Sequence, residues 1–115
     1  PPDPIEWTKR DAEGNPMPFQ YGNSKGYYIC PNNPYWLQYL DGVLHMIADA
    51  GLDGARYDGP IDPCHCKWCA AAFGKWLRER YSAQELAEHF GVKGEGPVPA
   101  PKDKPDPLLF LCRNY

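Results

Sequence analysis

The stretch Cys64-His65-Cys66-Lys67-Trp68-Cys69 decides how this chain is organised. Its three cysteines have the spacing C-x-C-x2-C, which lets about one turn of backbone supply several thiolate ligands to one metal ion. Zinc in structural sites is held by four such ligands in a tetrahedron. Cys30, much earlier in the chain, is the predicted fourth ligand. The expected site is closed and structural, and it joins two distant parts of the chain.

Disulfides and unpaired buried thiols are the alternative interpretations of these cysteines. Disulfides need an oxidising compartment, and the sequence does not begin with a positively charged segment followed by an apolar stretch. Two bridges would also place one inside the cluster, where short loops are strained. We therefore favour zinc and a cytoplasmic location. His65 is interpreted as a solvent-facing side chain, and Cys112 is expected to lie outside the site.

Composition limits the classes of function that remain. The 115 residues form one domain at most, and the net charge of −3 with no basic stripe argues against a nucleic-acid partner. The apolar stretches are too short to span a bilayer, so no membrane partner is expected. The aromatic content of 14% suits either a packed core or stacking on sugars, with the core as the default explanation.

Predicted strands and helices alternate in the middle of the chain. Residues 1–26 have no periodicity and are predicted to be an irregular loop segment. A short strand is expected over residues 27–29, followed by a helix over about residues 34–50 that begins after the N-cap Asn33. Apolar residues recur down one face of this helix at helical spacing. A second strand is expected over residues 55–58.

Two further helices follow the cysteines. One is predicted from about Lys67 to Tyr81, and a capping-box pattern from Ser82 to Glu85 begins another that ends at Gly91. This completes a segment over residues 27–91. Residues 92–115 are interpreted as a Pro-rich linker and the start of the next element.

The order strand, helix, strand, helix predicts an α/β fold with a parallel βαβα unit. Two parallel strands alone would leave long edges and half a core exposed. We therefore expect the chain to be an interior piece of a larger α/β protein.

Two segments of the sequence form a recognisable pattern. One is Tyr28-Ile-Cys30-Pro31-Asn-Asn-Pro34-Tyr; the other is Cys64-His-Cys66-Lys-Trp-Cys69, followed by Phe73, Trp76-Leu77 and Arg80-Tyr81. Both segments resemble glycoside hydrolase family 42. The resemblance implies a (β/α)8 TIM barrel, of which this chain covers roughly the third and fourth βα units. It also implies that the four cysteines hold zinc. The family ends its fourth strand in Asn-Glu, whereas this sequence has Tyr57-Asp58-Gly59, so β-galactosidase activity is not carried across.

Asp58 is the candidate catalytic residue. A carboxylate at the C-terminal end of a barrel strand points into the mouth where such enzymes work, although Asp before Gly-Pro is also ordinary turn chemistry. Arg56 and Tyr57 are candidates for substrate binding, and Arg56 would share a strand face with Asp58. Trp68 is either a platform for a sugar or a shield that packs beside the metal.

Two classes of function stay open at this point. The first is part of a glycoside hydrolase that acts on a carbohydrate substrate, completed by the remainder of the barrel. The second is a non-catalytic zinc-stapled module that binds a carbohydrate or a protein, with a pseudo-enzyme barrel in the same class.

Overall fold

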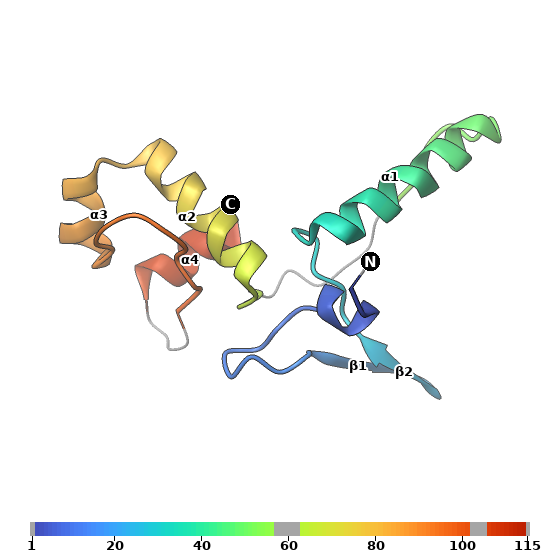
Figure 1. Ribbon diagram of the computed structural model, residues 1–115, viewed down its shortest axis with the longest axis horizontal. Helices are drawn as coiled ribbons and strands as arrows, with labels where there is room; N and C mark the ends of the chain where they lie inside the picture. Colours follow the sequence, from blue (N-terminus) through green and yellow to red (C-terminus); the bar gives the residue numbers. More distant parts are fainter. Residues whose placement is uncertain (1, 57–62, 102–105, 115) are drawn as a thin grey trace.

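The computed structural model describes residues 2–56, 63–101 and 106–114. A short 3-10 helix over Pro4–Trp7 precedes the strands β1 (Pro18–Tyr21) and β2 (Ser24–Tyr27). The helices are α1 (Pro34–Asp49), α2 (Lys67–Arg80), α3 (Ala83–Phe90) and α4 (Pro107–Asn114). Helices α2, α3 and α4 gather together, and α1 extends away from them (Figure 1). The radius of gyration is 16.5 Å, against about 13 Å for a compact chain of this length.

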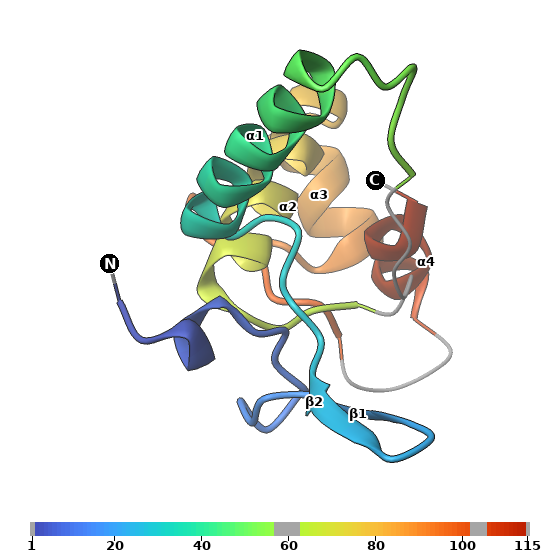
Figure 2. The same ribbon diagram turned by 90° about the vertical axis from the view of Figure 1, so that its right-hand side faces the viewer.

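The N-terminal segment contains a β-hairpin, so the prediction of an irregular loop over residues 1–26 is wrong there. β1 and β2 pair antiparallel, with Pro18 opposite Tyr27 and Tyr21 opposite Ser24. Gly22 and Asn23 form the two-residue loop between the strands, a length that favours tight hairpin turns. The hairpin lies apart from the helices (Figure 2).

The expected strand over residues 27–29 has different neighbours from those predicted. Tyr27 ends β2, and Ile29 forms an antiparallel bridge with Thr8. The hairpin turn folds the preceding chain back beside this region, which explains the antiparallel pairing. Ala55 and Arg56 have no strand conformation, and the rest of the predicted strand over 55–58 lies outside the described residues. The parallel βαβα unit and the barrel therefore stay predictions.

Helix α1 forms where the sequence predicts it. The Asn33 side chain accepts hydrogen bonds from the backbone N–H groups of Tyr35 (2.9 Å) and Trp36 (3.2 Å), and Pro34 occupies the first turn, where its missing N–H costs nothing. Gly51 follows the helix at φ 76°, a left-handed conformation that favours glycine.

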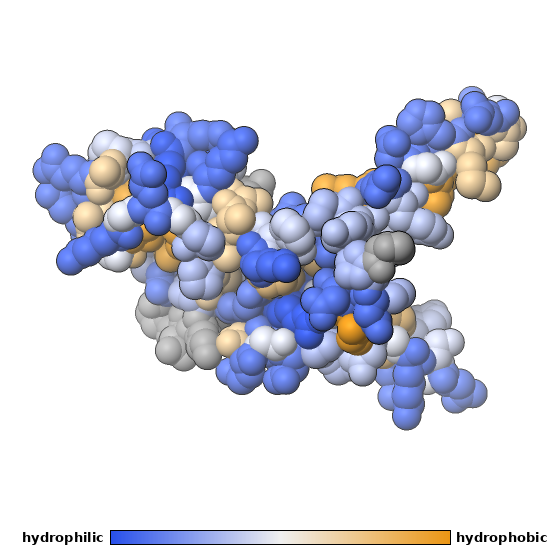
Figure 3. Space-filling view, in the orientation of Figure 1, coloured by the Kyte–Doolittle hydropathy of each residue, from blue (hydrophilic) through white to orange (hydrophobic). Residues whose placement is uncertain are grey.

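The apolar face of α1 is not buried by any described part of the chain. The helix has no buried residue, and Leu37 and Leu44 are 48% and 45% exposed. Hydrophobic surface is visible along this helix in Figure 3. The predicted core face of α1 is thus present in the sequence but is only partly covered by the described residues, since Leu40, Val43 and Ile47 are half-buried.

The main apolar core lies between α2, α3, α4 and the segment that precedes α4. Its buried members are Phe73, Leu77, Leu86, Val98 and Leu108. The predicted capping box at the start of α3 is confirmed, because Ser82 and Glu85 satisfy each other's backbone N–H groups. Cys112 packs against this core, away from the other cysteines. No helix in the described ranges has both the length and the apolar character needed to cross a membrane.

Residues 92–101 have no regular secondary structure but are not a free linker. The backbone N–H of Val98 donates to the carbonyl of Ala70 at 2.8 Å, and the Arg78 guanidinium donates to the carbonyls of Gly96 (2.6 Å) and Gly94 (3.1 Å). Gly74 permits this approach, since a Cβ there would lie 2.7 Å from the Gly96 carbonyl oxygen. The predicted linker therefore packs along α2 and braces the helix that contains Cys69 and has Cys66 as its N-cap.

Candidate metal centre

Cys30 is fixed by backbone hydrogen bonds on both sides. Its N–H donates to the Trp7 carbonyl at 2.8 Å, and its own carbonyl accepts from the Asn33 N–H at 3.2 Å. The second bond closes a tight turn through Pro31 and Asn32 that leads directly into α1. The Cys30 side chain is fully buried. The N-cap of α1 and the first cysteine are therefore positioned by the same turn.

The other three cysteines lie at the start of α2. Cys66 is the N-cap of this helix, and its sulfur accepts a hydrogen bond from the Cys69 N–H at 3.4 Å. Cys69 is one turn into the helix, so both sulfurs lie at its N-terminal end. The positive end of the helix dipole favours thiolates at this position. Cys64 precedes the helix and is also buried.

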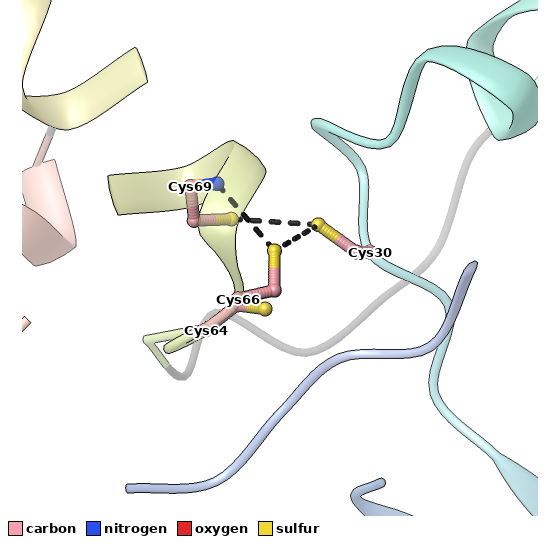
Figure 4. Close-up of side chains that lie close together, drawn as sticks. All are labelled: Cys30, Cys64, Cys66 and Cys69. Carbon is pink, nitrogen blue, oxygen red and sulfur yellow. Dashed lines mark hydrogen bonds between the residues drawn. The ribbon is translucent and has the colours of Figure 1, made fainter. Parts of the chain in front are cut away.

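The four sulfur atoms converge on one point. Cys30 Sγ lies 3.4 Å from Cys66 Sγ and 3.4 Å from Cys69 Sγ, and all four sulfurs lie within 4.8 Å of one another. Figure 4 shows the sulfurs of Cys30, Cys66 and Cys69 turned toward one another, with Cys64 beside them. A tetrahedral ion with Zn–S bonds of about 2.3 Å needs sulfurs about 3.8 Å apart. The donor set and its spacing therefore fit a tetrathiolate metal ion.

The cysteines are all free thiols, and no disulfide joins them. His65 is not a member of the group of possible ligands among the described residues, and it is half-buried rather than fully solvent-facing as predicted. Its backbone N–H donates to the Arg10 carbonyl at 2.9 Å. His65 thus helps to position the cysteine loop through its backbone rather than through its ring.

Mutual hydrogen bonds perturb the acidity of the thiols. The Cys30 thiol lowers the pKa of Cys64, with Cys66 and Cys69 adding to the effect. Hydrogen bonding by Cys30 likewise contributes most to lowering the pKa of Cys66, to about 7. The same contacts raise the pKa of Cys30, with Cys64 as the largest cause. Thiolate character near neutral pH favours metal binding, because the thiolate is the ligand form.

The N-terminal segment closes over the cysteine loop. The Lys9 N–H donates to the Tyr28 carbonyl at 2.7 Å, which aligns this segment beside the chain that leads to Cys30. The next N–H, of Arg10, donates to Cys64 Sγ at 3.4 Å. Thr8 and Lys9 are only 3% and 2% exposed. Residues 7–10 therefore connect the two halves of the cluster.

The sequence analysis missed two residues that contact the ligands. The backbone N–H of Arg10 donates to Cys64 Sγ, and the Asn32 side chain donates from Nδ2 to Cys69 Sγ, each at 3.4 Å. No pattern in the sequence marks Arg10. Asn32 lies two residues after Cys30 in the same tight turn, and this position is the signal that could have indicated it.

The predicted substrate-binding and catalytic residues are not brought together by the described structure. Arg56 is exposed, and Tyr57 and Asp58 lie outside the described residues. Trp68 is half-buried in the first turn of α2, and the Lys67 ammonium lies 4.9 Å from the centre of its ring. Trp68, Arg10 and His65 help to line a depression of about 370 Å³ beside the cluster. Trp68 therefore lies next to the candidate ligand Cys66, and the two roles predicted for it stay predictions.

The chain is similar to two curated enzymes. It is 31% identical to beta-galactosidase BgaB of Geobacillus sp. (strain Y412MC61) over an alignment of 84 residues, and the match covers 64% of this chain and 12% of that enzyme. It is also 31% identical to beta-galactosidase bgaB of Geobacillus kaustophilus over an alignment of 75 residues, and that match covers 56% of this chain and 11% of that enzyme. The chain thus spans about one eighth of the length of these relatives. No protein-family model matches the chain, and no solved structure matches it. The similarity indicates a distant relation to glycoside hydrolases.

Proposed function

We propose that this chain is the zinc-stapled part of a glycoside hydrolase-like (β/α)8 barrel that hydrolyses O-glycosidic bonds. The similarity to two beta-galactosidases carries the proposal, because it covers 64% and 56% of this chain. The motifs that resemble glycoside hydrolase family 42 support the same conclusion.

The zinc has a structural role in this proposal. Four thiolates complete a tetrahedral shell and leave no open position for water or substrate. Cys30 and Cys69 come from separate parts of the chain and are both buried. The bound metal contributes its binding free energy to folding by joining the turn before α1 to the start of α2.

The exposed apolar face of α1 supports a larger assembly around this chain. A helix with Leu37 and Leu44 about half exposed gains little from burial in the described structure. In a barrel such a helix covers the strands with its apolar face. The remainder of the barrel would supply the surface that α1 lacks here.

Asp58 is the proposed catalytic carboxylate of this segment. Glycoside hydrolysis uses two carboxyl groups on opposite sides of the scissile bond, so a second Asp or Glu must come from another strand of the barrel. Arg56, two residues earlier, would keep Asp58 ionised if the two side chains meet. This favours a nucleophile or a base over a general acid.

The test compares Asp58→Asn with the unchanged full-length protein on aryl glycosides, beginning with aryl β-galactosides. Asp58→Asn should lower turnover by about 10²–10⁴-fold while zinc content and circular dichroism stay unchanged. Asp53→Asn is the matched control, because Asp53 is exposed near the same segment, and it should retain full activity.

Equal activity in both variants would overturn the catalytic role of Asp58. Hydrolysis by the 115-residue chain alone would overturn the barrel proposal, because one carboxylate cannot perform a two-carboxylate reaction. A full-length protein that hydrolyses no glycoside would instead favour the non-catalytic zinc-stapled module.

A further inference from the structure

Three N–H groups point at the sulfurs of the cluster. The backbone N–H of Arg10 donates to Cys64, the backbone N–H of Cys69 donates to Cys66, and Asn32 Nδ2 donates to Cys69, each at 3.4 Å. Zn²⁺ with four thiolates carries a net charge of −2, and hydrogen bonds to sulfur disperse that charge. The two backbone donors are set by the fold, whereas the third depends on a side chain.

Asn32 spans the two halves of the site. Its backbone belongs to the turn between Cys30 and Asn33, and its side chain reaches a cysteine 37 residues later in the chain. A thiolate only accepts hydrogen bonds, so the NH₂ end of the amide must face Cys69. The residue is half-buried, which shields this bond from water.

We propose that Asn32 is a positioning residue of the metal centre, which retains the bound zinc by donating its amide N–H to the Cys69 thiolate. This inference rests on the proposed zinc site. Outer partners of this kind change metal affinity by about 10–100-fold when they are replaced.

A second role for Asn32, as a turn former, makes the opposite prediction for one substitution. Asn and Asp both stabilise such turns through the side-chain oxygen, so a turn role alone leaves Asn32→Asp close to the original protein and Asn32→Ala weaker. The donor role reverses this order. An Asp carboxylate cannot donate, and its negative charge beside the Cys69 thiolate repels it, whereas Ala only removes the hydrogen bond.

The experiment measures zinc affinity by competition with a chromophoric chelator for the original protein, Asn32→Ala and Asn32→Asp. The expected order of affinity is original, then Ala, then Asp, with Asp weaker than the original by about 10–100-fold. Asn23→Asp is the matched control, because it makes the same charge change at an exposed hairpin position, and its affinity should equal that of the original.

The cobalt-substituted protein gives a second readout. Loss of the N–H···S bond raises the energy of the sulfur electrons, so the sulfur-to-cobalt charge-transfer band of Asn32→Ala should move to longer wavelength. This band reports on the bound site, so it tests the inference even where Asn32→Asp fails to fold.

The possible failures are distinguishable. An original protein that takes up no metal would overturn the proposed zinc site and this inference together. An original protein that binds zinc, with Asn32→Asp of equal affinity and Asn32→Ala with an unmoved cobalt band, would overturn only the role of Asn32.

Discussion

Replacing Gly74 with Ala tests how the segment before α4 braces α2. A Cβ at Gly74 would lie 2.7 Å from the Gly96 carbonyl oxygen and 3.2 Å from the Val98 backbone nitrogen, so the segment has to move away. The hydrogen bond from Arg78 to the Gly96 carbonyl is charged and contributes roughly 1.5–3 kcal/mol, and the bond from Val98 to Ala70 contributes roughly 0.5–1.5 kcal/mol. Ala restores about 1 kcal/mol of helix propensity. The expected net loss is roughly 1–3.5 kcal/mol in the free energy of unfolding.

Gly42→Ala is the control for this prediction. Gly42 is also inside a helix, but nothing lies within 4 Å of the position that its Cβ would occupy. The substitution should therefore increase stability by about 1 kcal/mol. Urea unfolding followed by far-UV circular dichroism in the presence of zinc measures both variants. If both variants gain the same stability, the result would contradict the packing of residues 94–98 against α2.

Four other substitutions test the core and the helix caps. Leu77→Ala leaves a cavity at a fully buried position and should lower the free energy of unfolding by roughly 2–5 kcal/mol. A loss below about 1 kcal/mol, measured by urea unfolding, would contradict the core between α2, α3 and α4. Asn33→Ala removes the cap of α1 and a hydrogen bond to the Glu6 carbonyl. It should lower the free energy of unfolding by at least about 1 kcal/mol. An unchanged free energy of unfolding would contradict the role of Asn33 as the cap. Ser82→Ala should cost about 1 kcal/mol through α3. Hydrogen bonds from Ser82 lower the pKa of Glu85 below its ordinary 4.5, so the Glu85 contribution is complete above 4.5 and is lost as the pH falls through the lowered value. The stability difference between the original protein and Glu85→Gln should therefore stay constant above pH 4.5 and shrink as the pH falls below it. A difference that stays constant at all pH values would contradict the capping box.

Helices α1, α2 and α3 could be predicted because their signals are local, whereas α4 lies where the sequence predicted only a linker and the start of a further element. Asn33-Pro34, the capping box from Ser82 to Glu85 and the glycines that follow α1 and α3 each act within one turn of chain. The cysteine spacing likewise identified four residues whose sulfurs converge in the structure. The three cysteines of C-x-C-x2-C are brought together by the local geometry of the chain. The approach of Cys30 to them depends on how distant parts of the chain fold.

The hairpin was missed although its signal was present. Gly22-Asn23 separates two short runs that contain aromatic residues, and two-residue loops of this type indicate hairpins. The alternation of apolar and polar residues that marks a strand was hard to recognise, because the strands are short and Pro residues flank the hairpin. The packing of residues 92–101 had no comparable signal, because it depends on Gly74 and Arg78 meeting carbonyls about 20 residues later.

The exposed face of α1 marks the limit of what this chain determines by itself. Its helical period was predicted correctly, and the burial expected from that period is not found among the described residues. A helix forms from local propensity and capping, whereas its burial depends on a partner surface. The barrel proposal supplies that surface from the rest of a longer protein.

X-ray absorption at the zinc edge tests the central claim most directly, because it counts the ligands and measures their distances in solution. We predict one zinc ion per chain with four sulfur neighbours at about 2.3 Å and no nitrogen or oxygen neighbour. A shell that contains nitrogen or oxygen would contradict the closed structural site. A protein purified under reducing conditions with all five thiols free and no bound zinc would contradict the metal centre itself.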